Sequence, residues 1–169
     1  MAIYEFKKSL EFGKKGEDFI WMYLQKQTNV CKLWDVRDNE FYQKIDIDFI
    51  SESENGTKNY IEVKTDSYTS GNIYYEVLSS ANSDGCMYKT KADTLYYYYP
   101  NMSKLYIFDL NKFRDFVESC LDWFDFKGYK KSVKNYSGNG MSTYESIGYA
   151  IPLSLFHMME PKWMEIITF

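Results

Sequence analysis

Two short segments with alternating apolar and charged residues, joined by a tight-turn signal, constrain this sequence more than any other feature. The first, residues 44–49, reads Lys-Ile-Asp-Ile-Asp-Phe, and a period of two is typical of a strand with one buried face. The second, residues 60–64, alternates in the same way and has Glu62 and Lys64 on one face. An Asn-Gly dipeptide at 55–56 lies between them and favours a hairpin. The sequence therefore predicts two antiparallel strands that carry acidic groups and a lysine on one face.

The charged face of this hairpin indicates a site for a hard cation. Asp48 and Glu62 fall on facing strands, so their carboxylates can lie close together and would repel each other without a cation. Oxygen ligands with no histidine or thiolate nearby favour Mg²⁺ or Mn²⁺ over zinc. Lys64 shares the face and could orient an attacking water or stabilise charge on a phosphorane-like transition state. Hydrolysis of a phosphodiester bond fits this chemistry.

A helix is expected upstream of the hairpin, over residues 9–26, because apolar residues recur there at three- and four-residue steps. Gly16 lies within the apolar stripe. A glycine inside a helix costs about 1 kcal/mol relative to alanine, so this one indicates a close approach to another backbone. Glu17 lies at the edge of the same face, which is an unusual place for an acid that only meets solvent.

The sequence resembles the PD-(D/E)xK nuclease superfamily, which includes many restriction endonucleases and the archaeal-type Holliday junction resolvases. The matching residues are Ile-Asp-Phe-Ile at 47–50, Ile-Glu-Val-Lys at 61–64, and a Gly-Glu helix at 16–17 before the core. Ile47 stands where the motif's name has proline. The resemblance covers residues 10–66. It implies a metal-dependent nuclease that hydrolyses DNA with Mg²⁺ or Mn²⁺.

The resemblance also assigns roles to single residues. It implies that the carboxylates of Glu17, Asp48 and Glu62 and the Val63 carbonyl bind the metal. It also implies that Lys64 is the catalytic lysine.

Several assignments remain open at the level of sequence. Asp46 lies on the same expected strand face as Asp48, so either could bind the metal, although the apolar residues directly after Asp48 favour it. Glu76, on the next expected strand, is a further candidate ligand. Lys89 and Lys91 are candidate nucleic-acid contacts, but a solvated basic loop is the simpler explanation.

The fold class predicted is α/β, restriction-endonuclease-like, with a mixed central sheet flanked by helices and a C-terminal elaboration. A length of 169 residues suits one domain. The expected nuclease core is about 9–126 and the elaboration about 127–169, with a loop at 136–140. Further strands are expected at 30–34, 72–78, 94–99, 105–110 and 147–151, and a helix at 113–124.

Composition limits the partners. A formal charge of −4 and a pI near 5.1 exclude a protein-wide positive field, so nucleic acid would have to bind through a local basic patch. A bound cation would offset part of the acidic charge. Aromatic residues reach 20%, and such rings serve base stacking, a core or an interface. Only two arginines are present, which disfavours strong sequence readout through guanine.

Cysteine usage and the N-terminus bear on location, and the proposed chemistry bears on assembly. Three widely spaced cysteines and an N-terminus without an apolar signal core favour reduced thiols and a cytoplasmic location, away from membranes. A homodimer would supply two centres for two DNA strands.

The acidic hairpin could instead be a solvated surface with an ion pair. The chain could also be an inactive binding or accessory module of the same fold, from a phage or defence system, or an RNA-directed nuclease.

Overall fold

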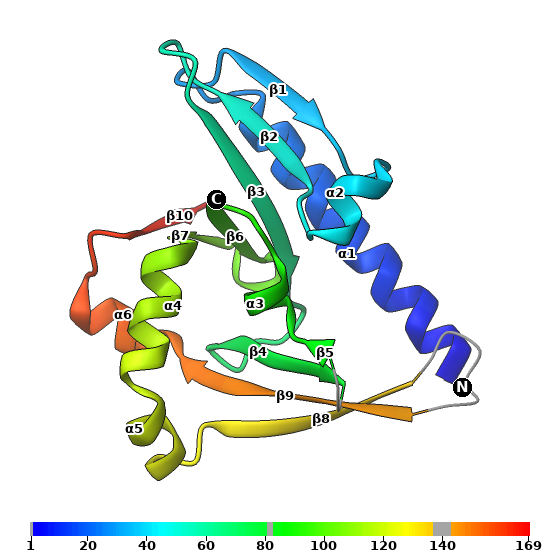
Figure 1. Ribbon diagram of the computed structural model, residues 1–169, viewed down its shortest axis with the longest axis vertical. Coiled ribbons are helices and arrows are strands. Elements are labelled where there is room, and N and C mark those ends of the chain that lie inside the picture. Colours follow the sequence, from blue (N-terminus) through cyan, green and yellow to red (C-terminus); the bar gives the residue numbers. More distant parts are fainter. Residues whose placement is uncertain (1, 81–82, 137–142) are drawn as a thin grey trace.

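The computed structural model describes residues 2–80, 83–136 and 143–169, and their strands form two sheets (Figure 1). Sheet A is six-stranded and has the order β1-β2-β3-β6-β7-β10. Its strands are β1 (Lys32–Asp35), β2 (Phe49–Glu52), β3 (Lys58–Thr65), β6 (Thr94–Tyr99), β7 (Lys104–Asp109) and β10 (Met164–Thr168). All neighbours are antiparallel except β3 and β6, which run parallel. The chain is therefore mixed α/β with a mixed sheet, as predicted.

Sheet B is four-stranded, with the order β5-β4-β9-β8. Its strands are β4 (Asn72–Ser80), β5 (Ser83–Asp84), β8 (Lys130–Tyr136) and β9 (Thr143–Pro152). The described helices are α1 (Ala2–Leu24), α2 (Glu40–Lys44), α3 (Cys86–Lys89), α4 (Leu110–Ser119), α5 (Leu121–Phe126) and α6 (Leu153–Met159), with a 3₁₀ turn at Pro100–Met102. None of these helices is long and apolar enough to cross a membrane.

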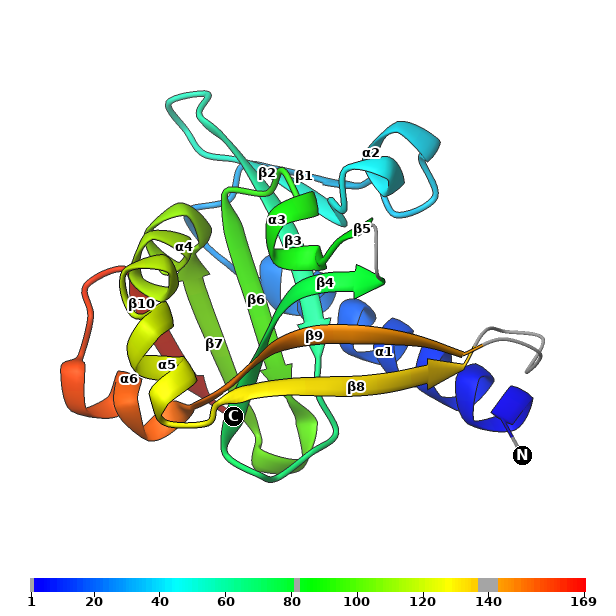
Figure 2. The ribbon, with the colours of Figure 1, turned by 60° about the horizontal axis from the view of Figure 1, so that its bottom comes forward.

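Sheet A is covered on both faces (Figures 1 and 2). α1 lies over one face, where Ile20 and Leu24 pack against β3 residues such as Ile61. The other face packs on sheet B, α4 and α6 through a larger cluster rich in aromatic rings, among them Phe108 and Phe113, whose centroids are 4.5 Å apart. Most of the aromatic residues thus serve the core, where each ring buries a large apolar area.

The C-terminal residues belong to both sheets. β9 pairs with β4 in sheet B, and β10 pairs with β7 at one edge of sheet A. The segment expected as an elaboration, 127–169, therefore completes both sheets. Beyond Tyr136, the loop expected at 136–140 lies outside the described residues.

The predicted strand over residues 44–49 is wrong for most of its length. Its first residue ends α2, and β2 begins only at its last residue. Asn39 caps α2, because its side chain accepts hydrogen bonds from two backbone N–H groups of the first turn. Asp46 then adopts a positive φ of 47°, and Ile47 is buried. The alternation of residue types reflects a loop whose apolar side chains meet the core.

The hairpin itself is confirmed. β2 and β3 pair antiparallel, with Phe49 opposite Ile61. The turn between them contains Gly56 at φ 82°, a left-handed conformation that favours glycine. Asn55 accepts hydrogen bonds through its side-chain oxygen from the Ser53 hydroxyl and the Thr57 N–H. The Asn-Gly signal in the sequence therefore identified the turn correctly.

Candidate active site

Asp48 is fixed against β3 although it precedes the first residue of β2. Its backbone N–H donates to the Ile61 carbonyl at 2.8 Å. Its carboxylate oxygen Oδ2 accepts the Val63 N–H, also at 2.8 Å. These two contacts hold the carboxylate beside Glu62, the residue between Ile61 and Val63. The predicted juxtaposition of the two acids is thus present in the structure.

Glu62 and Lys64 share one face of β3, as the alternation predicted. Glu62 is only 4% exposed and is the one charged residue among the buried residues that the structure describes. The Lys64 ammonium Nζ lies 2.5 Å from Glu62 Oε1. A buried carboxylate beside a lysine on a strand face is not a solvated surface pair, which was the simpler alternative for this hairpin.

Glu17 reaches the same region from α1. The preceding residue, Gly16, has no room for a side chain, because a Cβ there would meet the Thr65 hydroxyl oxygen at 1.9 Å. The close approach inferred from this glycine is confirmed, although the neighbour is a side chain of β3 and not a backbone. α1 therefore lies tightly against the end of β3, next to Lys64.

Arg37 was not identified from the sequence and organises this end of the site. Its guanidinium lies 3.2 Å from a Glu17 carboxylate oxygen, 2.8 Å from Asp18 and 2.7 Å from Asp35. It thereby ties α1 to the loop that follows β1. The only signal for Arg37 in the sequence was that it is one of two arginines, whereas lysine supplies the other long basic side chains.

These side chains surround one cavity of about 220 Å³. Its acidic lining residues outnumber its basic ones two to one, so negative charge remains after the internal ion pairs are counted. The lining residues are Glu17, Arg37, Gln43, Asp46, Ile47, Asp48, Glu62, Val63 and Lys64.

Ionisation of the site reflects this excess of acid. Burial raises the pKa of Asp48 to about 6; the Val63 hydrogen bond opposes the shift and the charge of Glu17 adds to it. Burial likewise raises the pKa of Glu62 above its ordinary value, with Lys64 opposing and Asp48 contributing. Burial is the largest influence on the pKa of Lys64 and lowers it, but the charge of Glu62, its hydrogen bond and the charge of Asp48 together hold that pKa above its ordinary value.

The donor set fits a hard divalent cation in composition. Carboxylates and a strand carbonyl are the ligands that Mg²⁺ accepts, and magnesium commonly uses only one or two carboxylates together with water. Within the described residues, no three His, Cys, Asp or Glu side chains converge as a finished metal cluster. Two of the carboxylates are paired with cationic side chains of the protein, Glu17 with Arg37 and Glu62 with Lys64. Asp48, bound through one oxygen to a backbone N–H, is the carboxylate not held by a lysine or arginine.

Asp46 lines the same cavity but has other partners. Its carboxylate lies 2.7 Å from Lys89 Nζ, and its carbonyl accepts the Thr90 hydroxyl at 2.6 Å. Of the two aspartates, Asp48 is the one fixed to β3. Lys89, a candidate nucleic-acid contact, is engaged in this ion pair. Lys91 is exposed, and its backbone N–H donates to Ile45.

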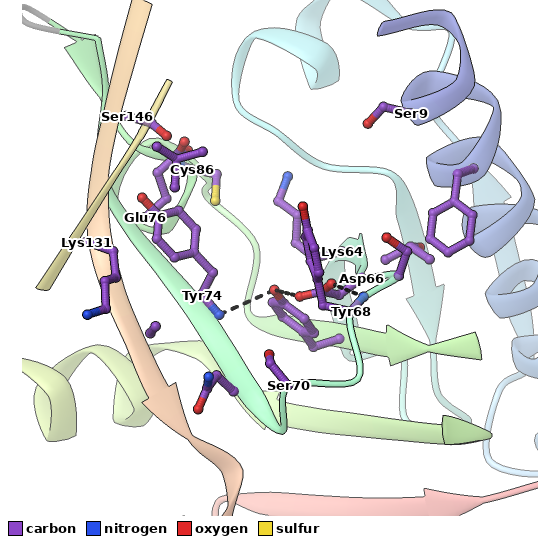
Figure 3. A pocket seen from close by; sticks show the side chains of 17 residues that line it. Ser9, Lys64, Asp66, Tyr68, Ser70, Tyr74, Glu76, Cys86, Lys131 and Ser146 are labelled. Atoms are coloured by element: carbon purple, nitrogen blue, oxygen red, sulfur yellow. Dashed lines mark hydrogen bonds between the residues drawn. The ribbon is translucent and has the colours of Figure 1, made fainter. Parts of the chain in front are cut away.

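Glu76 does not lie with the other acids. Its carboxylate accepts the Cys86 N–H at 3.0 Å, and it lines a second, larger cavity on the far side of Lys64 (Figure 3). Lys64 lines both cavities. The two spaces therefore meet at the lysine of the Glu-x-Lys triplet.

Comparison with models of known protein families, with curated proteins and with solved structures gave no match. The function of the site therefore rests on the chemistry of its residues.

Proposed function

We propose that this chain is a Mg²⁺- or Mn²⁺-dependent endonuclease of the PD-(D/E)xK type, with a restriction-endonuclease-like core, that hydrolyses DNA phosphodiester bonds. The observation that carries the proposal is the meeting of Glu17, Asp48, Glu62 and Lys64 at one small acidic cavity. These residues come from three separate elements, and two of them are carboxyls whose pKa values burial raises. Perturbed carboxyls that converge on a cavity are typical of functional sites.

Each residue has a role that follows from its position. Asp48, Glu62 and the Val63 carbonyl would hold the cation, with Glu17 as a further ligand or as a holder of its water. When bound, the cation would polarise the phosphate and lower the pKa of an attacking water. Lys64 carries its positive charge at the edge of the cavity, where it can neutralise charge that develops on the phosphate oxygens.

The competing function is a catalytically silent binding module of the same fold. The ion pairs favour it, because Arg37 and Lys64 already neutralise two of the carboxylates without any cation. The two functions differ in what removal of Glu62 does. In a nuclease, Glu62→Gln removes DNA cleavage. In a silent binding module, the same substitution changes only the stability of the protein.

The test is a cleavage panel. Wild-type protein is incubated with Mg²⁺ and labelled single-stranded, duplex and branched DNA, and with single-stranded RNA. We expect cleavage that EDTA abolishes, and a loss of about 100-fold or more in Asp48→Asn, Glu62→Gln and Lys64→Met. Glu165→Gln, which removes an exposed carboxylate on β10, is the control and keeps full activity. Absence of cleavage of every DNA substrate, or equal activity in Glu62→Gln, overturns the DNA nuclease; cleavage of RNA alone reassigns the substrate.

Assembly stays a prediction. A homodimer would place two such centres about a two-fold axis, as cutting two strands requires. Light scattering gives the mass in solution, and a monomeric mass at working concentration contradicts the dimer.

A further inference from the structure

The cavity on the far side of Lys64 is the larger of the two, at about 650 Å³. It lies between the end of β3 with its following loop and one face of sheet B (Figure 3). Ser9 and Phe12 of α1 also line it. Pockets that hold one small organic group usually measure about 300 to 1,000 Å³. The space therefore suits a single base with its sugar, and is too small for paired strands.

One face of sheet B forms the floor of this cavity. Strand register places alternate residues of β4, β9 and β8 side by side: Tyr74 pairs with Ala150, and Val133 pairs with Ser146. All four line the cavity. Gly148 lies between Ser146 and Ala150 on β9, and a Cβ there would meet the Tyr74 ring at 2.8 Å. The glycine thus leaves room for the tyrosine ring to lie across the strand.

The opposite wall presents an aromatic ring from an ordered loop. Asp66 accepts a hydrogen bond from the Tyr68 N–H at 2.8 Å and another from the Tyr97 hydroxyl at 3.2 Å (Figure 3). Asn101 fixes the same loop through the Ser67 carbonyl. The backbone of Tyr68 is therefore held, while its side chain is 73% exposed. A ring presented in this way can stack on a base, whatever the base is.

Basic groups mark the two ends of the cavity. Lys64 lies at the end shared with the acidic site, and Lys131 of β8 lines the cavity from sheet B. The acids in the lining have partners within the protein, since Asp66 accepts from Tyr97 and Glu76 accepts from the Cys86 N–H. Among the described residues Lys131 has no acidic partner, since its ammonium donates to the Gly128 carbonyl at 3.0 Å. Lys64 is paired with Glu62 and carries its charge at the junction of the two cavities. Lys131 belongs to a local basic strand of the kind that an acidic protein needs for nucleic acid.

We propose that this cavity receives an unpaired nucleotide of a single-stranded nucleic acid whose backbone passes from Lys131 to Lys64. The inference rests on the proposed nuclease function and names its substrate class. The base stacks against Tyr68 and Tyr74, and the strand is delivered to the acidic cavity at Lys64. Because the cavity has room for one nucleotide and not for a base pair, the expected substrate is single-stranded DNA or RNA, or a branched structure with a single-stranded arm.

Binding is tested by fluorescence anisotropy with labelled dT12, rU12 and a 12-base-pair duplex, in EDTA and with Ca²⁺ in place of Mg²⁺. We expect a single strand to bind at least about tenfold more tightly than the duplex. A preference between dT12 and rU12 identifies the sugar. Tyr68→Ala and Lys131→Glu should each weaken binding of the preferred strand by about tenfold.

Lys130→Glu is the matched control. It makes the same charge change on the neighbouring residue of β8, but Lys130 alternates to the other face of the strand, where its ammonium lies over the Tyr149 ring. Its effect should stay within about threefold. Equal losses in Lys130→Glu and Lys131→Glu, duplex binding as tight as single-strand binding, or no binding in either buffer overturns the inference.

The two proposals fail in different ways. Single-strand binding that depends on Tyr68 and Lys131, without cleavage in Mg²⁺, supports this cavity and overturns the nuclease. Metal-dependent cleavage of duplex that is unchanged in Tyr68→Ala and Lys131→Glu supports the nuclease and overturns the cavity.

Discussion

Asp48→Asn should stabilise the protein at neutral pH while it removes activity. Burial raises the pKa of Asp48 from 3.8 to about 6, which means that the folded state disfavours the charged form. About two pKa units at 1.36 kcal/mol each give about 3 kcal/mol as the upper size of this destabilisation. Asparagine removes the charge and retains an oxygen that can accept the Val63 N–H, so the hydrogen bond at 2.8 Å survives.

The sign of the pH dependence follows from linkage. Well below pH 3.8 the carboxyl is protonated in both the folded and the unfolded state, and it contributes no destabilisation. As pH rises through the folded-state pKa near 6, the unfolded state gains more from ionisation and the destabilisation reaches its full size. The stability difference between Asp48→Asn and wild type should therefore be about 0.6 kcal/mol at pH 4 and about 3 kcal/mol at pH 7.

Urea unfolding in EDTA at pH 4, 5, 6 and 7 measures this difference. Asp46→Asn is the control, because Asp46 is paired with Lys89; losing that pair should cost up to about 1 kcal/mol and give no gain. A variant Asp48→Asn that is no more stable than wild type at pH 7, or that gains equally at pH 4 and pH 7, would refute the account of a buried, uncompensated carboxylate.

Two further predictions test the scaffold by thermal or urea unfolding. Gly16→Ala should destabilise the protein by about 1–3 kcal/mol, because the new Cβ would collide with Thr65. Its control, Gly13→Ala, meets nothing within 4 Å and should stabilise by up to about 1 kcal/mol. Equal effects of the two substitutions would contradict the packing of α1 on β3. Phe156→Ala should lower the free energy of unfolding by about 3–5 kcal/mol, because the ring is fully buried. Its control, Phe126→Ala, removes a residue that is 83% exposed and should change that free energy by about 0.5 kcal/mol or less. A comparable loss in both variants would show that the core is misplaced.

Local signals predicted the hairpin and its acids well. The Asn-Gly turn fixes the register of β2 and β3, and Glu62 and Lys64 share a face because β3 is a regular strand. Gly16 identified the close approach of α1 because a glycine within a helix needs a local reason. The hairpin contacts lie between strands joined by one turn, whereas the glycine signalled a close approach without identifying Thr65 as the neighbour.

The same local signals could not predict contacts between segments that are far apart in the sequence. The alternation at residues 44–49 has the period of a strand, yet the Asn39 cap and the positive φ of Asp46 make most of it helix end and loop. Arg37 meets Glu17 only because α1 and the loop after β1 come together in three dimensions. The second sheet likewise depends on pairing between β4 and β9, which are far apart in the sequence.

The same long-range pairing creates the larger cavity. Lys131 comes from β8, Tyr68 from the loop after β3, and their separation along the chain carries no local signal. Basic residues in the sequence had pointed to Lys89 and Lys91, but Lys89 is paired with Asp46 in the fold. Lys131, in contrast, has no acidic partner among the described residues, since its ammonium donates to the Gly128 carbonyl.

The central claim is that Asp48 and Glu62 form a site for a hard divalent cation. Isothermal titration of the metal-free protein with Mg²⁺ and Mn²⁺ at neutral pH tests it most directly, with Glu62→Gln and Asp48→Asn as the altered proteins and Glu165→Gln as the control. The account predicts saturable binding by the wild type and the control, weakened at least about tenfold in each site variant. Absence of binding by the wild type, or equal affinity in Glu62→Gln, would contradict it.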